Sequence, residues 1–241
     1  MKLKTITVTG IDDRTDIKVL QNIQRQFPIV EFGVLISDDW EENGNRFMKP
    51  EKILNLRGKN LRLSAHLCGD VAIRNVEGRE FGPRWMSIRQ FDNLFDRCQL
   101  NISKAKQDLD IDLSDWPSHI ELIIQAKSTK DKDRKVYDSI LAESVEYIEP
   151  TVLIDPSGGK GLQGKMDILP SVHKVGYAGG INAGNIREKI MELESDYRVS
   201  DYWLDMESGV RTDNWFDVDK VMEVLDEYLK AKAEIETFTN K

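Results

Sequence analysis

The sequence predicts an α/β fold of the (β/α)8 TIM-barrel class, in which eight parallel strands alternate with helices around a common axis. Three observations support this prediction: eight short apolar segments recur along the chain, most of them end at glycine, and segments with helical periodicity stand between them. The length of 241 residues fits one such barrel, which typically needs about 250 residues. An open doubly wound sheet is the alternative, but eight units with glycine exits favour the closed barrel.

The first predicted strand alternates threonine with isoleucine or valine. The others are mostly continuous apolar runs, as expected when helices cover a parallel sheet. The first six strands are predicted at Thr5 to Ile11, Val30 to Ser37, Leu61 to Leu67, Cys98 to Ile102, Ile120 to Ala126 and Thr151 to Asp155. The seventh lies in VGYAGGINAGNI, from Val175 to Ile186, and the eighth in YWLDMESGVRT, from Tyr202 to Thr212.

Helices are predicted where apolar residues recur at helical spacing, or where a capping residue or a proline marks a first turn. These segments are Ile17 to Phe27, Pro50 to Leu56, Ser87 to Asp96, Asp131 to Ser144, Asn185 to Leu193 and Phe216 to Lys230. The expectation is a single domain over residues 1–241, with a frayed tail over roughly residues 230–241.

The composition describes a globular protein with an ample core, since 40% of the residues are hydrophobic and 32% are charged. The formal net charge of −8 argues against binding to nucleic acid, which requires a basic surface. No apolar run is long enough for a transmembrane helix and the N-terminus lacks a signal-peptide pattern, so a cytoplasmic protein without membrane contact is expected. Two cysteines provide neither a disulfide framework nor a zinc pattern. We expect no metal, no cofactor, and a monomer or homodimer.

Glycine-rich turns after the last three strands predict a phosphate site. Glycine lets backbone N–H groups approach an anion closely, and barrels of this class commonly bind phosphate in the loops after strands 7 and 8. The candidate phosphate-binding residues are Gly158, Gly159, Gly179, Gly180, Ser208 and Gly209. The competing interpretation is that a barrel needs glycine at its strand–loop corners. The predicted partner is therefore a phosphorylated small molecule.

Six motifs stand in order along the predicted strands and loops. They are Thr7-Val8-Thr9-Gly10-Ile11, the segment Asn45 to Glu51, Gln99-Leu100-Asn101, Leu153-Ile154-Asp155 with its glycine-rich exit, Ala178 to Asn182, and Asp205 to Val210. Together they resemble the motifs of the phosphoribosylanthranilate isomerase family, small barrel enzymes of tryptophan synthesis. The resemblance implies a barrel of the ribulose-phosphate-binding type that isomerises a phosphorylated sugar derivative with an acid and a base, without a cofactor. It assigns Asp155 as the general acid and places Arg46 near the substrate.

Three residues depart from the family's pattern. Thr9 stands where the family has its cysteine base, and a threonine hydroxyl cannot usefully accept a proton near pH 7. Asn101 replaces a histidine, and Arg211 replaces a residue that is usually acidic. The candidate substrate-binding residues are Arg46, Asn101, Asp205 and Arg211.

His66, near the exit of the third strand, is the natural substitute for the missing base. The candidate catalytic residues are therefore Asp155, His66 and Thr9. The alternative interpretation of His66 is a histidine that is hydrogen-bonded within the barrel. Asp205 and Glu207 share one face of the eighth strand, where they could serve as an acid and a base or could simply form hydrogen bonds inside the barrel.

The sequence leaves three functions open. The first is isomerisation of a phosphorylated sugar derivative. The second is an aldolase or epimerase reaction on a phosphosugar, using Lys127 as a Schiff-base lysine or the region of His66. The third is a non-catalytic barrel that binds a phosphorylated metabolite. Loss of the family base favours the third function, whereas retention of Asp155 beside two glycine corners disfavours a decayed site.

Overall fold

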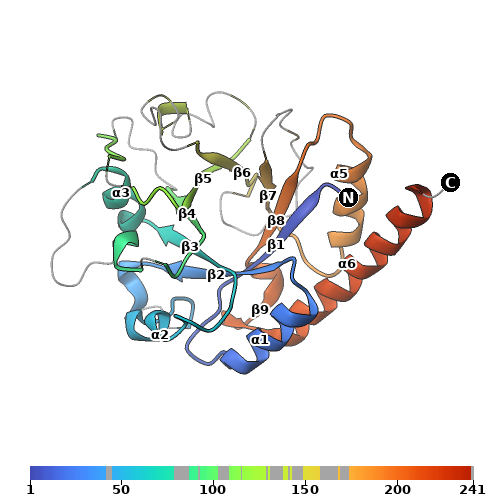
Figure 1. Cartoon of the computed structure of the whole chain (residues 1–241), viewed down its shortest axis with the longest axis horizontal. Coiled ribbons are helices and arrows are strands. Elements are labelled where there is room, and N and C mark those ends of the chain that lie inside the picture. Colours follow the sequence, from blue (N-terminus) through green and yellow to red (C-terminus); the bar gives the residue numbers. More distant parts are fainter. Residues whose placement is uncertain are drawn as a thin grey trace.

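Eight parallel strands close into a barrel in sequence order, with β1 paired to β8, and this confirms the predicted fold class (Figure 1). The computed structural model describes the chain apart from residues 42–44, 79–86, 92, 103–108, 115, 129, 131–137, 141, 143–148, 158–167, 169–173 and 240–241. The strands are β1 (Leu3–Thr9), β2 (Val30–Ile36), β3 (Leu63–Cys68), β4 (Arg97–Asn101), β5 (Glu121–Ala126), β6 (Thr151–Ile154), β7 (Val175–Tyr177) and β8 (Tyr202–Met206).

Helix α1 begins directly after a residue whose side chain caps it. Asp16 accepts a hydrogen bond from the amide of Lys18 at 2.8 Å, and this caps the first turn of α1. The α-helices are α1 (Ile17–Gln26), α2 (Pro50–Leu54), α3 (Asp70–Val76), α5 (Ile186–Ser195) and α6 (Val218–Thr239). Short 3₁₀ turns are η1 (Asp38–Trp40), η2 (Ile88–Phe91) and η4 (Ser208–Val210), and a hairpin follows β8 as β9 (Arg211–Thr212) and β10 (Trp215–Phe216).

Several helices differ from the sequence-based expectation. The predicted helix from Ser87 to Asp96 is only the 3₁₀ turn η2, because Asn93 takes a left-handed conformation with φ of 59°. Helix α3 was not predicted, and it begins directly after Gly69. The predicted helix from Asp131 to Ser144 falls for the most part outside the described residues.

The C-terminal tail is helical as far as Thr239, beyond the predicted helix end at Lys230. The buried Ala231 and the partly buried Ile235 continue the apolar stripe that Tyr228 belongs to, at the spacing of an α-helix. Figure 1 shows α6 along the outside of the barrel, with its C-terminal end projecting beyond the strands. Charged side chains are abundant in this segment, so its apolar stripe is difficult to recognise in the sequence.

The apolar core lies mainly between the strands and the helices, and the barrel interior is largely polar. Ile6 and Val8 of β1 pack in the outer core, whereas Thr7 and Thr9 form hydrogen bonds within the barrel. A small apolar cluster fills part of the interior. It consists of Ile123, Leu153, Ala178 and Trp203.

An ion-pair network, which we call the floor network, occupies the interior near the amino-terminal ends of the strands. It consists of Glu31, Arg97, Glu121, Lys174 and Trp203. Arg97 lies 3.0 Å from Glu31 and 3.2 Å from Glu121, and its guanidinium stacks over Trp203 at 4.3 Å. Buried charges are costly in free energy unless they are paired. In this network, near the amino-terminal ends of the strands, each charged group lies close to one of opposite charge.

Gly176 on β7 lies in close contact with side chains of the barrel interior, and it provides a stability prediction. A Cβ atom at this residue would lie 2.2 Å from the Trp203 ring and 2.6 Å from Leu153. We expect Gly176→Ala to lower the free energy of unfolding by about 1–3 kcal/mol through overpacking, as measured by urea denaturation. The control is Gly184→Ala, in an exposed turn where the nearest atom to a Cβ would be 3.1 Å away. Equal effects of the two substitutions would contradict the packing argument.

Candidate active site

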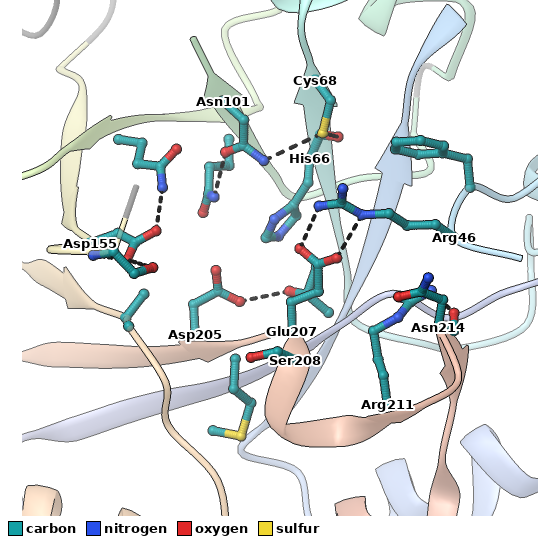
Figure 2. A pocket seen from close by; sticks show the side chains of 18 of the residues that line it. Arg46, His66, Cys68, Asn101, Asp155, Asp205, Glu207, Ser208, Arg211 and Asn214 are labelled. Carbon is teal, nitrogen blue, oxygen red and sulfur yellow. Dashed lines mark hydrogen bonds and ion pairs between the residues drawn. The ribbon is translucent and has the colours of Figure 1, made fainter. Parts of the chain in front are cut away.

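A cavity of about 860 Å³ opens at the carboxyl ends of the strands (Figure 2). Most of the predicted site residues line it. These are Thr9, Arg46, His66, Asn101, Asp155, Gly179, Gly180, Asp205, Ser208 and Arg211. Gly158 and Gly159 lie outside the described residues, and Lys127 is exposed and does not line the cavity. This end of a TIM barrel carries the active site in characterised enzymes of the fold.

Asp205 is the most strongly perturbed acid in the cavity. Its carboxylate accepts a hydrogen bond of 2.6 Å from the hydroxyl of Thr9. Burial raises the pKa of Asp205 to about 7, the Thr9 hydrogen bond opposes the rise, and the nearby charges of Glu207 and Asp155 add to it. A carboxyl group with this pKa exchanges protons readily at neutral pH, which suits a general acid or base. Strand alternation correctly placed Asp205 inside the barrel, but the sequence carries no signal for its pKa.

Asp155 follows β6 directly, and its buried carboxylate is held from two sides. Gln125 donates a hydrogen bond of 2.6 Å to one oxygen. The hydroxyl and the amide of Ser157 donate to the other oxygen at 2.6 Å and 3.0 Å. Figure 2 shows the carboxyl groups of Asp155 and Asp205 in the same cavity. Since only β7 separates the strands that carry them, both can act on one small molecule.

His66 also faces the interior, but its environment weakens it as a base. Its Nε2 lies 3.1 Å from the Ser64 hydroxyl. Burial, together with the positive charge of Arg97, lowers the pKa of His66 to about 3. The imidazole is therefore neutral at physiological pH and binds a proton poorly. The lowered pKa favours a hydrogen-bonding role for His66, and its role as the base stays a prediction.

Cys68 and Asn101 complete the wall beside His66. The Asn101 amide lies 3.5 Å from the Cys68 sulfur as a donor, and its oxygen accepts a hydrogen bond of 2.7 Å from Gln99. Burial raises the pKa of Cys68 to about 11. The thiol stays protonated at neutral pH, so it does not replace the cysteine base that the family has on its first strand.

Both candidate substrate-binding arginines are held by other parts of the protein. Arg46 forms a bidentate ion pair with Glu207, with distances of 2.9 Å and 3.2 Å (Figure 2). Arg211 is buried and donates to the carbonyl oxygens of Gly10 and Asn45 at 2.9 Å each, and also to that of Asn214. We call these Arg211 contacts the arginine clasp, because they join the exit of β1, the loop after β2 and the hairpin after β8.

The glycine corner after β7 has the backbone shape that anion sites use. Gly179 and Gly180 have φ of 103° and 65°, a region that favours glycine. Ser208, the first residue of η4, lines the cavity beside them. Gly209 does not line it. A Cβ there would lie 2.1 Å from the carbonyl oxygen of Ile181, so Gly209 serves close packing of the β8 loop against the β7 loop.

Neither a metal site nor a membrane span is found in the part of the chain that the structure describes. No group of three or more histidine, cysteine, aspartate or glutamate side chains there could hold a metal ion. No helix among the same residues is long and apolar enough to cross a membrane.

Together, the fold and the cavity define a (β/α)8 barrel with two buried carboxyl groups at the carboxyl ends of its strands. Among solved structures, the chain is similar to N-(5'-phosphoribosyl)anthranilate isomerase from Pyrococcus furiosus. The TM-score is 0.54 and the identity 15%, over 92% of this chain and 97% of that chain. It is also similar to phosphoribosyl anthranilate isomerase from Thermococcus kodakaraensis, with a TM-score of 0.55 and 12% identity, over 94% of this chain and 99% of that chain.

These likenesses establish a shared fold over nearly the whole chain, and they confirm the resemblance at that level. No model of a known protein family matches the sequence, and a search of curated proteins finds no match either. The chain thus keeps the barrel of phosphoribosylanthranilate isomerases at a sequence identity too low to carry over their activity.

Proposed function

We propose that this protein isomerises a phosphorylated sugar derivative by acid/base catalysis, without a cofactor. The observation that carries the proposal is the pair of buried carboxyl groups, Asp155 and Asp205, in one cavity beside a glycine corner suited to phosphate. The fold shared with phosphoribosylanthranilate isomerases supports the same class of reaction. The Amadori-type conversion of phosphoribosylanthranilate, a step of tryptophan biosynthesis, is its most specific form.

The two carboxyl groups divide the chemistry. Asp155 donates a proton to the ring oxygen of the sugar as the bond between that oxygen and C1 breaks, which opens the ring. Asp205 in its carboxylate form then removes the proton from C2, and the resulting enol tautomerises to the ketose. Because the pKa of Asp205 is about 7, a substantial fraction is ionised at neutral pH while its basicity remains useful. The Thr9 hydroxyl donates a hydrogen bond to Asp205, and so orients the carboxylate rather than acting as a base itself.

The phosphate end of the substrate is proposed to bind at the corner of Gly179, Gly180 and Ser208. We expect inorganic phosphate to bind there, and Gly180→Val to weaken that binding by about tenfold, or 1.4 kcal/mol, because the side chain strains a backbone with positive φ. Isothermal titration calorimetry measures the affinities. Gly184→Val, in an exposed turn of the same segment, is the matched control. An equal loss in both variants would argue against phosphate binding at this corner.

Two experiments test the reaction itself. Incubation with aldose phosphates in deuterated water, followed by NMR, is expected to show exchange of the hydrogen at C2, which enolisation requires. Complementation of a strain that lacks phosphoribosylanthranilate isomerase tests the most specific form of the proposal. Asp155→Asn serves in both experiments as the variant with strongly reduced activity.

A second candidate function is a non-catalytic barrel that binds a phosphorylated metabolite. It is favoured by Thr9 at the position of the family's base and by the low pKa of His66. Absence of C2 exchange, with phosphate binding intact, would select it. An aldolase reaction that uses Lys127 as a Schiff-base lysine receives no support, because Lys127 is exposed and does not line the cavity.

A further inference from the structure

We propose that the cavity selects phosphorylated sugars whose second charged group is an ammonium, and that Glu207 determines this selectivity by occupying Arg46. The inference rests on the proposed function and names its substrate class. It concerns the end of the substrate that lies away from the phosphate. Three observations carry it.

The first observation is that the Arg46 guanidinium is already engaged. Its Nε and Nη2 atoms donate to the two oxygens of Glu207 at 2.9 Å and 3.2 Å. This fork-to-fork geometry is the one an arginine uses for a substrate carboxylate. A carboxylate on the ligand would have to displace Glu207 and leave that charge without its partner. The ion pair therefore lowers the affinity of the cavity for a carboxylate ligand more than its affinity for a neutral or cationic ligand.

The second observation is the charge of the cavity wall. Two cations, Arg46 and Arg211, line it among the residues that the structure describes. The carboxyl groups on the same described wall are five, namely Asp39, Asp155, Asp205, Glu207 and Asp213. The second arginine is tied by the arginine clasp to backbone carbonyl oxygens. In this described part of the wall carboxyl groups outnumber cations, and such an excess attracts a cationic group and repels a second anion.

The third observation is an acceptor in the cavity wall without a donor. Gln99 is only 3% exposed, and it directs its amide N–H to Asn101. Its Oε1 atom is buried with no hydrogen-bond partner in the structure. Because a buried acceptor without a partner is costly, this oxygen is suited to a hydrogen-bond donor on the ligand. An ammonium group supplies donors only, and a carboxylate supplies none.

The test uses three ligands that share a six-carbon chain and a phosphate but differ in their second charged group. D-Glucosamine 6-phosphate carries an ammonium, D-glucose 6-phosphate carries none, and 6-phospho-D-gluconate carries a carboxylate. At pH 7.0 we expect the affinity of the wild-type protein to fall in that order, with about a tenfold difference between the first and the last. Isothermal titration calorimetry provides the dissociation constants.

The Glu207→Gln variant tests whether Glu207 determines the ligand selectivity. The substitution keeps the side-chain shape but removes the charge, which leaves Arg46 available. We expect 6-phospho-D-gluconate to bind about tenfold more tightly than to the wild type, and the preference for glucosamine 6-phosphate to shrink. Glu234→Gln is the matched control, because Glu234 pairs with Arg187 at 2.7 Å on the outer helices and away from the cavity. It should leave the order unchanged.

The outcomes separate this inference from the proposed function. Equal affinities for the three ligands, or a preference for the carboxylate, would overturn the inference while leaving phosphate recognition in place. Efficient complementation by the wild-type chain would do the same, because phosphoribosylanthranilate carries a carboxylate. Failure of all three ligands and of inorganic phosphate to bind would contradict both proposals. If Glu207→Gln does not fold, the order measured on the wild type still decides.

Discussion

Replacing Asp205 with asparagine is expected to lower the isomerisation rate by about 10²- to 10⁴-fold, the range that a general base contributes. Asparagine keeps an oxygen that accepts the hydrogen bond from the Thr9 hydroxyl, so the local geometry should survive. The carboxylate that removes the substrate proton is lost. The kinetic signature is a fall in kcat with little change in KM. Thr9→Val is the companion variant, and it should reduce the rate less, because it removes only the hydroxyl that orients Asp205. A rate for Asp205→Asn within a few-fold of the wild type would remove Asp205 from the mechanism.

The same substitution should change how stability depends on pH. The folded-state pKa of Asp205, about 7, lies above its ordinary value of 3.8. The folded protein therefore binds more protons than the unfolded chain between these values, and Asp205 makes stability fall as pH rises from about 4 to 7. The shift corresponds to up to about 4 kcal/mol at 1.36 kcal/mol per pKa unit. Asp205→Asn should be more stable than the wild type at pH 8.

His66 acts in the opposite direction over nearly the same range. Its folded-state pKa of about 3 lies below the ordinary 6.5, so it makes stability rise with pH between those values. In the wild type the two slopes oppose each other, and in Asp205→Asn the rising slope of His66 should no longer be opposed by Asp205. Urea denaturation at pH 4.5, 6.0 and 7.5 measures both profiles. Parallel profiles for the two proteins would contradict the assigned burial of Asp205.

Asp155→Asn is expected to reduce the rate by about 10²-fold or more, the lower range for a general acid. An amide cannot supply the proton that opens the sugar ring, although it preserves the size of the side chain. Ser157→Ala is the matched control, because it keeps the carboxyl group and removes only one hydrogen bond of 2.6 Å. It should cost far less in kcat. An unchanged kcat in Asp155→Asn would exclude Asp155 as the acid.

The strands and the cavity could be predicted from sequence because their signals are local. A run such as Leu153-Ile154-Asp155 shows both a buried strand and the carboxylate at its exit, and glycine after Tyr177 marks the next corner. The properties of His66 could not be predicted, because its low pKa depends partly on Arg97, which a neighbouring strand supplies. The pairing of Arg46 with Glu207 joins residues 161 positions apart, and no local pattern shows it.

The barrel closes along one seam, between β1 and β8, and the proposed chemistry is built across that seam. Thr9 and Asp205 are 196 residues apart in the chain, and Gly10 and Arg211 are 201 apart. Contacts of such long sequence separation form late in folding, because the cost of closing the chain must be met first. During synthesis, the first seven strands emerge from the ribosome before Asp205 does. A chain that stops short of its last strand therefore carries Asp155 and the glycine corner but lacks Asp205, so the pair of carboxyl groups is complete only when the whole barrel has been made and closed.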